Sequence, residues 1–268
     1  MSIGYACISI GVPGTGLRTC TKKFATPELL SEIIGSNLRS LERQIDYNVE
    51  QGIRLFRISS DIIPFAGTAV NTVDWANDFQ ESLKRISGKI MAGRIRVSMH
   101  PGQYTVINTK DEGVLTRAVD DLTWHAKFLD VLGTPLSSKI VLHIGGVYDD
   151  KVEAMRRFVK RFRALDDKIR RRLVIENDER LYTVDDVLQI SSEIGVPVVY
   201  SGTLQSDSGV CLNAVGITFL QGGEDVKYDT SLKGELTCVC FIGPNGAKLV
   251  PVPDGQVCIG ANLRPIFF

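Results

Sequence analysis

Short apolar runs alternate with longer helical patterns along the first 200 residues, and this alternation constrains the fold more than any other feature. The apolar runs, each typical of a buried strand, cover residues 3–9, 53–59, 95–99, 139–144, 173–176 and 196–200. The helical patterns between them cover residues 27–51, 73–91, 111–132, 149–172 and the segment that begins after Thr183. Strands that alternate with helices predict a parallel sheet covered by helices.

Capping residues mark the ends of several predicted helices. Thr26 followed by Pro27 is a typical helix start, because proline lacks the amide that a first turn leaves unpaired. Thr183, three residues before an aspartate, is a second start signal. Gly52 and Gly133 stand where the apolar periodicity stops. These signals support the helical assignment of the segments between the strands.

The residues that follow the apolar runs distinguish between two kinds of parallel sheet. The glycine-rich segment at residues 11–16 matches neither a dinucleotide-binding fingerprint nor a P-loop. Polar residues recur instead at the carboxyl ends of successive runs, where a barrel builds its active site. These are Ser59-Ser60-Asp61, His100, His143 and Glu176-Asn177-Asp178. We therefore predict an α/β fold, a TIM-type βα-barrel that is incomplete and has about six βα units.

The character of the sequence changes after Tyr200. Residues 209–268 contain short strand-like runs separated by turn signals such as Pro244-Asn245-Gly246, and they contain no long helical pattern. We predict two parts, a partial barrel over residues 1–200 and a β-rich segment of unknown origin over residues 201–268. Within the second part, we expect residues 209–268 to form antiparallel β structure. Three origins of this segment stay open: a replacement domain, a frameshift, or a partner module joined to a degenerate barrel.

Composition limits the classes of protein only weakly. Lys plus Arg and Asp plus Glu both number 31, so the net charge gives no support for nucleic-acid binding unless basic residues gather locally. No apolar run approaches the roughly 18–20 residues that cross a bilayer. The first residues also lack the pattern of a signal peptide. We expect a cytoplasmic protein that does not act on membranes.

Three titratable residues stand at the ends of three successive predicted strands. His100, His143 and Glu176 carry imidazole and carboxylate groups, which are natural ligands for Mn²⁺ or Zn²⁺. Three neighbouring strand ends converge in a barrel, so we favour a divalent metal site over three separate hydrogen-bonded polar residues. His125 lies inside a helical pattern instead, and we interpret it as a packed or exposed helix residue.

Two further features could contact DNA. Residues 151–172 include ten Lys or Arg, which we interpret as the solvated face of an outer helix rather than a phosphate-binding face. Gln103-Tyr104 follows His100 directly in a predicted loop. An amide beside an aromatic ring could wedge into a duplex and stack on bases, although simple loop packing is the alternative.

Five segments, taken in order over about residues 1–200, resemble the UV damage endonuclease family. They are Ile3-Gly4-Tyr5-Ala6-Cys7, residues 56–66, His100-Pro101-Gly102-Gln103-Tyr104, His143-Ile144-Gly145-Gly146 and Glu176-Asn177-Asp178. Each motif is modest alone, but the ordered set is specific. The resemblance implies a single βα-barrel with two or three divalent metals, usually manganese, at the strand ends. It also implies an endonuclease that repairs DNA by hydrolysing the phosphodiester on the 5′ side of UV photoproducts.

The resemblance further implies roles for individual residues. His100, His143 and Glu176 would be catalytic metal ligands, and Gln103 and Tyr104 would probe the lesion, with Tyr5 near the same groove. The expected partner is damaged double-stranded DNA, which the protein would meet as a monomer and, when acting, at the nucleoid.

The chain also departs from the family pattern. Thr68 stands where the family has a histidine, and Ser9 where it usually has asparagine. The sixth strand ends at Tyr200 without the aspartate and the following histidine that the family carries. We therefore expect fewer bound metals and an activity impaired by the loss of C-terminal ligands. Two alternatives stay open: an inactive protein that binds damaged DNA, and a metal-dependent sugar isomerase or epimerase of the xylose-isomerase-like barrel type.

Overall fold

Six parallel strands form a half-barrel in the computed structural model. The structure describes residues 2–7, 9, 11–178, 180–205, 211–219, 237–239, 242–243 and 246–247. The six strands are β1 (Ser2–Ala6), β2 (Leu55–Ile58), β3 (Arg96–Met99), β4 (Ile140–His143), β5 (Leu173–Glu176) and β6 (Val198–Gln205). Each of the first five pairs in parallel with the strand that follows it in the sequence. This topology confirms the predicted incomplete βα-barrel.

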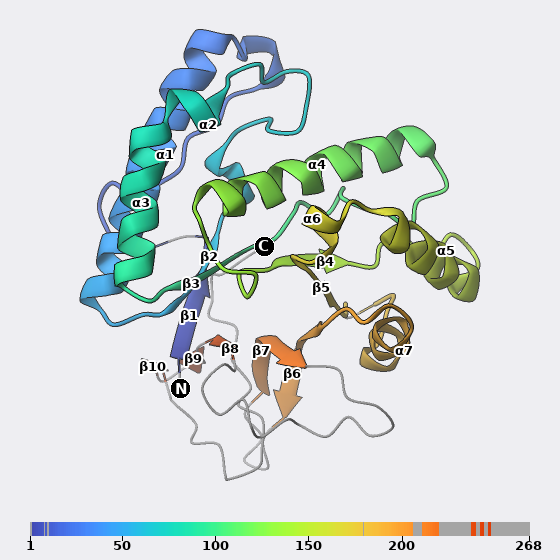
Figure 1. Cartoon of the computed structure of the whole chain (residues 1–268). Coiled ribbons are helices and arrows are strands. Elements are labelled where there is room, and N and C mark those ends of the chain that lie inside the picture. The colour runs from blue at the N-terminus through green and yellow to red at the C-terminus, as the bar shows by residue number, and fades with distance from the viewer. Residues whose placement is uncertain are drawn as a thin grey trace.

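Helices connect these strands and cover the outer side of the sheet. In Figure 1 they stand around the strands in chain order, with α1 and α3 at left, α4 above, and α5 and α7 at right. The α-helices are α1 (Pro27–Glu50), α2 (Trp75–Asp78), α3 (Gln80–Ala92), α4 (Glu112–Val131), α5 (Lys151–Ala164), α6 (Asp167–Arg170) and α7 (Val184–Ile194). Two short 3₁₀ helices, η1 (Lys22–Phe24) and η2 (Ser60–Ile62), lie in loops.

The predicted caps form as the sequence indicates. The side chain of Thr26 accepts a hydrogen bond from the amide of Leu29 at 3.3 Å, with proline at the first helical position. Thr183 and Asp186 form a reciprocal capping box at the start of α7, and Gly195 ends that helix with a φ of 71°.

Two of the predicted helices are broken, which corrects the sequence-based boundaries. The helix expected over residues 73–91 divides into α2 and α3 at Phe79. The helix expected over residues 149–172 ends at Ala164, because Leu165 adopts an extended conformation with a ψ of 149°. Asp166 then caps α6 by accepting from the amide of Lys168 at 2.7 Å. Leu165 stays buried across the break, so the apolar periodicity does not reveal it.

The main core lies between the sheet and its helices. Ile34 and Leu38 of α1 and Phe128 of α4 are buried there together with Phe56 and Leu142 of the strands. The inward face that the sequence predicts for the basic helix is confirmed, since its apolar residues are all buried. These are Ala154, Met155, Phe158, Phe162, Leu165 and Ile169.

Further strands extend the sheet beyond residue 200. β6 continues past the predicted end at residue 200 to Gln205, and β7 (Cys211–Phe219) pairs with it in antiparallel fashion. β8 (Thr237–Val239) pairs with β1 in parallel, which corrects the expectation of a wholly antiparallel segment. β9 (Ile242–Gly243) and β10 (Gly246–Ala247) form an antiparallel pair. The rest of the predicted β-rich segment lies outside the described residues.

Within the described part of the chain, none of the helices combines the length and the apolar character that crossing a bilayer requires.

Candidate metal centre

His100, His143 and Glu176 meet at the carboxyl ends of three neighbouring strands. Each offers one ligand atom, and these three atoms lie within 4.8 Å of one another. The Nε2 atom of His100 is 3.1 Å from Oε2 of Glu176, and Nε2 of His143 is 3.8 Å from the same oxygen. The three residues that the sequence analysis selects as metal candidates therefore face one point.

The sheet register brings these residues together. His143, the last residue of β4, is paired with Glu176, the last residue of β5. His100 directly follows Met99, the end of β3, which pairs with Ile140 of β4. Because neighbouring parallel strands end at the same edge, residues that end them lie side by side. The register of the sheet thus brings the three residues to one edge.

Hydrogen bonding at His100 leaves one ring nitrogen available as a ligand. Its Nδ1 lies 2.8 Å from the carbonyl oxygen of Pro101, and a carbonyl can only accept, so Nδ1 carries the proton. In the neutral ring Nε2 then directs a lone pair at the Glu176 carboxylate, an arrangement that is favourable only with a cation or a proton between them. The Nδ1 atom of His143 is buried and has no hydrogen-bond partner among the described residues. The residues present therefore fit a divalent cation, with the Pro101 carbonyl as an outer support.

The charges of the site also suit metal binding. Burial alone would raise the pKa of Glu176, but the hydrogen bond that a protonated His100 donates and the positive charges of protonated His100, Arg57 and protonated His143 outweigh burial and hold that pKa below its usual range. A bound cation would supply the positive charge in place of the imidazole protons. Burial lowers the pKa of His143, so its neutral form is favoured. An ionised carboxylate and a neutral imidazole are the protonation states that bind metals.

Ser60 holds the backbone carbonyl of His100 through a hydrogen bond, and His125 contacts the same Ser60 hydroxyl. The Ser60 hydroxyl lies 2.5 Å from the carbonyl oxygen of His100 and 2.9 Å from Nε2 of His125. Nδ1 of His125 lies 2.7 Å from the carbonyl oxygen of Asp121. His125 is fully buried inside α4, as the interpretation of a packed helix residue allows. Sequence reasoning missed its link to His100, because Ser60 and His125 are 65 residues apart.

Arg57 is another residue of the site that sequence reasoning missed. It is 8% exposed on β2, and its charge acts on both Glu176 and His143. The signal that could have identified it is a single charged residue inside the apolar strand Leu55–Ile58. A buried guanidinium whose charge acts on an ionised carboxylate offsets part of the unfavourable burial of both charges.

The three residues expected to contact DNA occupy different places. Gln103 and Tyr104 are exposed in the loop after His100, and 81% of Tyr104 is accessible. Tyr5 is partly buried, with its ring centroid 5.0 Å from that of Phe56 and its hydroxyl 2.6 Å from Oγ of Ser9. Among the described residues, Gln103 and Tyr104 thus share a loop with a triad member, whereas the contacts of Tyr5 are with Phe56 and Ser9.

The positions that depart from the family pattern also have clear local roles. The Thr68 hydroxyl donates to the carbonyl of Phe65 at 2.8 Å and so closes a turn on the surface. Ser9 is buried, and its carbonyl accepts from the Thr15 hydroxyl at 3.1 Å. Both residues stabilise loops near the strand ends rather than extending the triad.

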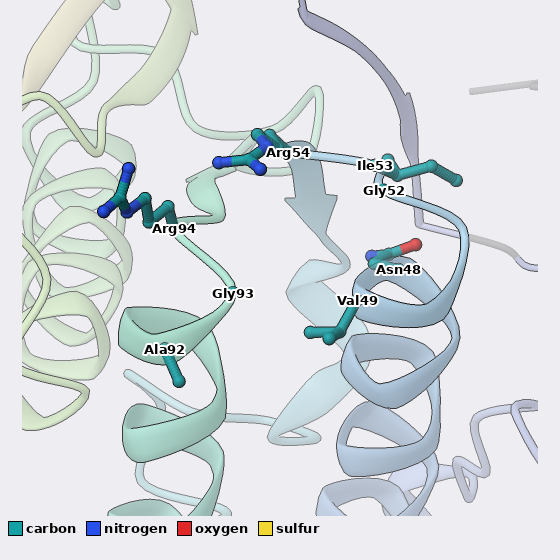
Figure 2. Close-up of a pocket in the computed structure, with 8 residues that line it drawn as sticks. All are labelled: Asn48, Val49, Gly52, Ile53, Arg54, Ala92, Gly93 and Arg94. Carbon is teal, nitrogen blue, oxygen red and sulfur yellow. The ribbon is translucent and has the colours of Figure 1, made fainter.

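A small cavity of about 220 Å³ lies at the other end of the strands (Figure 2). Its lining comes from the ends of α1 and α3 and from the residues just before β2 and β3. The residues are Asn48, Val49, Gly52, Ile53, Arg54, Ala92, Gly93 and Arg94. In barrels this end serves stability rather than chemistry, so the triad is the better candidate for a functional site.

Comparisons with known proteins point to one family. The model of the family UV-endonuclease UvdE matches residues 2–202. A UV DNA damage endonuclease from Clostridium perfringens is 46% identical over 201 residues, which are 75% of this chain and 48% of that protein. One from Bacillus cereus strain G9842 is 33% identical over 171 residues, or 64% of this chain and 54% of that protein. This chain therefore spans about half the length of the curated relatives it matches.

A solved structure is also similar to this chain. The crystal structure of SacUVDE is similar to this chain with a TM-score of 0.73 and 33% sequence identity. The match covers 87% of this chain and 75% of that one.

Proposed function

This chain belongs to the UV-endonuclease UvdE family, and from that premise we propose that it is a DNA repair endonuclease that incises damaged double-stranded DNA with the help of a divalent metal. The observation that carries the proposal is the triad, whose three ligand atoms lie within 4.8 Å of one another at the strand ends. Family membership favours this function over a sugar isomerase or epimerase, which would need a site for a small sugar instead.

We propose that His100, His143 and Glu176 hold the cation and that Mn²⁺ is the metal. Two imidazoles and one carboxylate are suitable ligands for this ion. When bound, such a cation supplies charge stabilisation at the phosphodiester and lowers the pKa of a bound water. The Glu176 carboxylate contributes the negative charge, and the Pro101 carbonyl keeps His100 in the tautomer whose Nε2 can bind.

The proposed DNA contacts come from Gln103 and Tyr104. An aromatic ring that is 81% exposed packs little against the described part of its own chain, and it can stack on a base that damage has unpaired or displaced. Gln103 and Tyr104 lie in the loop that follows His100, a member of the triad. Lesion recognition and incision can therefore occur at neighbouring points. We propose that incision occurs on the 5′ side of the lesion.

The remaining proposals concern the whole chain. The partial barrel of residues 1–200 supplies every residue named here, so one chain can act as a monomer. It would act in the cytoplasm, at the nucleoid. Thr68 replaces one family histidine, and we propose that fewer metals bind and that incision is slower than in the relatives.

The test is incision of UV-irradiated supercoiled DNA by the purified full chain. With Mn²⁺, irradiated DNA should be nicked and unirradiated DNA spared, and a chelator should abolish nicking. His143→Ala should be inactive, while the exposed-residue variant Glu193→Gln should match the parent. Mn²⁺ binding without any nicking would overturn the nuclease proposal, and preferential binding of irradiated duplex in that case would identify a damage-binding protein.

A further inference from the structure

Three loops at the strand ends are joined by a closed triangle of hydrogen bonds. The Asn108 side-chain amide donates to the carbonyl of Gly146 at 2.8 Å and to the hydroxyl of Tyr182 at 3.2 Å. The Tyr182 hydroxyl donates to the same Gly146 carbonyl at 2.9 Å. Asn108 and Tyr182 are both fully buried. Both amide protons of Asn108, the phenol proton of Tyr182 and both lone pairs of the Gly146 carbonyl are therefore used.

Each loop of this triangle follows a different member of the triad. Asn108 lies in the loop after His100, Gly146 in the loop after His143, and Tyr182 in the loop after Glu176. The strands already hold the triad through their register. The triangle joins the loops beyond the ends of these strands, where backbone pairing in the sheet no longer fixes the position of the chain.

The loop after His100 is divided into a buried base and an exposed tip. The base consists of residues 105–109, of which Thr105, Ile107, Asn108 and Thr109 are all buried. The tip carries Gly102, Gln103 and Tyr104, which are exposed. A fixed base beneath an exposed tip limits the positions that the tip can take.

Side chains from α4 and α5 hold the same base. Asp121 of α4 accepts from the Thr105 hydroxyl at 2.5 Å. Arg157 of α5 donates to the carbonyl of Asn108 at 2.7 Å, and Arg161 donates to the carbonyl of Ile107 at 3.0 Å and to that of Thr109. The interpretation of α5 as a uniformly solvated basic face is thus wrong for Arg157 and Arg161, although Arg156, Lys160 and Arg163 are exposed as expected.

The backbone next to the triangle also requires this close approach. Gly145 has a φ of +109°, and a Cβ atom there would lie 2.3 Å from Oδ1 of Asn108. Only glycine permits both the conformation and the contact. The loop after His143 is therefore shaped to receive the Asn108 side chain.

We propose that Asn108 and Tyr182 are positioning residues that hold the Gln103–Tyr104 tip at a set place relative to the triad, so that discrimination of damaged from undamaged DNA depends on them. The part of this inference that concerns DNA rests on the proposed function. Neither residue touches the substrate; both act through the buried base of the loop.

Two variants test this triangle of hydrogen bonds, here called the clamp, and they are chosen to retain the fold. Tyr182→Phe keeps the ring and removes only the hydroxyl, while Asn108→Ala removes both amide donors. Tyr47→Phe on α1 makes the same chemical change outside these loops. Thermal unfolding of each variant shows that the fold is retained before the clamp is measured.

Hydrogen exchange tests the clamp without reference to activity. Amides of residues 104–109 should exchange roughly five-fold faster or more in Tyr182→Phe and Asn108→Ala, because each loses hydrogen bonds that restrain local opening. Tyr47→Phe should exchange like the parent. Unchanged exchange over residues 104–109 in both variants would overturn the inference, whatever the protein does to DNA.

Binding to irradiated and unirradiated duplexes tests the consequence for recognition. The two variants should bind irradiated duplex about five-fold more weakly, with the affinities for unirradiated duplex and for Mn²⁺ unchanged. An equal loss for both duplexes, or weaker Mn²⁺ binding, would show general disruption and contradict a positioning role. If the parent itself shows no preference for irradiated duplex, the proposed function fails, and the exchange result alone then decides the clamp.

Discussion

The His100 ring nitrogen Nε2 faces the Glu176 carboxylate at 3.1 Å, while the other nitrogen of the ring is held by a backbone carbonyl. This pairing joins the residue after β3 to the last residue of β5 across β4, and the Glu176 side chain is only 4% exposed. A buried carboxylate that faces a nitrogen lone pair is stable only with a positive charge between the two. A bound cation would therefore act directly on this pair, and the first prediction depends on it.

Removing the carboxylate charge should weaken metal binding most. Glu176→Gln keeps the size of the side chain but replaces the anionic ligand by a neutral amide. We expect Mn²⁺ affinity to fall by about 100-fold or more, since even outer-shell changes lower metal affinity by about 10- to 100-fold. Calorimetric titration of the variant, the parent and Glu193→Gln measures this. Equal affinity in all three would place the metal elsewhere.

Loss of the Ser60 hydroxyl should destabilise the protein and weaken metal binding slightly. Ser60→Ala removes the group that joins the His100 carbonyl to His125. We expect the free energy of unfolding to fall by about 1–3 kcal/mol, because buried partners are left unpaired. Urea unfolding gives the value, with the exposed Ser192→Ala as the matched control. A change no larger than that of Ser192→Ala would contradict the supporting role of Ser60.

The metal-free protein should lose stability as the pH falls below about 6.5, the usual pKa of histidine in an unfolded chain. Burial lowers the pKa of both His125 and His143 in the folded protein. Below about pH 6.5 the unfolded state therefore binds more protons than the folded state, and the free energy of unfolding decreases as pH decreases. Denaturant unfolding between pH 7.5 and 5.5 measures the slope.

The histidine responsible can be identified by substitution. His125→Asn should show a flatter pH dependence than the parent over that interval, even though its stability at pH 7.5 is lower. An identical slope in parent and variant would show that His125 does not contribute.

Arg172 should matter for stability but not for the site. It is 2% exposed, and its guanidinium donates to Asp130 at 2.6 Å and to the carbonyls of Thr134, Pro135 and Ser138. Arg172→Met should lower the free energy of unfolding by about 3–5 kcal/mol, because Asp130 and the carbonyls lose their donor. Mn²⁺ affinity of the folded variant should equal that of the parent, since this cluster precedes β4 and β5 and lies away from the triad. Weaker Mn²⁺ binding by the folded variant would contradict this prediction, because it would show that the Arg172 cluster affects the triad at the other end of the strands.

Tyr104 should matter for DNA binding but not for stability. Because its side chain is 81% exposed, Tyr104→Ala should change the free energy of unfolding by no more than about 0.5 kcal/mol. Affinity for irradiated duplex should fall by about 10-fold, as expected for the loss of one base-stacking aromatic ring. Fluorescence anisotropy with irradiated and unirradiated duplexes provides the measurement. An unchanged affinity for irradiated duplex would remove Tyr104 from the proposed lesion contact.

Much of the fold could be predicted because its signals are local. The strand-helix alternation, the Thr26 and Thr183 caps and the inward face of α5 each depend on residues that are close in sequence. The breaks at Phe79 and Leu165 escaped prediction, since Leu165 continues the apolar spacing while its backbone leaves the helix. The parallel pairing of β8 with β1 also escaped, because it joins segments more than 230 residues apart.

By itself, the sequence determined that His100, His143 and Glu176 would share one edge of a parallel sheet. That conclusion needs only the ends of the apolar runs and the common direction of parallel strands. The tertiary structure alone decided that Arg57 lies beside the triad and that Arg157 and Arg161 hold a loop instead of facing solvent. It also decided the triangle of Asn108, Gly146 and Tyr182, whose members are 36, 38 and 74 residues apart. Such contacts depend on how separate loops meet in space, and no periodicity or spacing along the chain encodes that meeting.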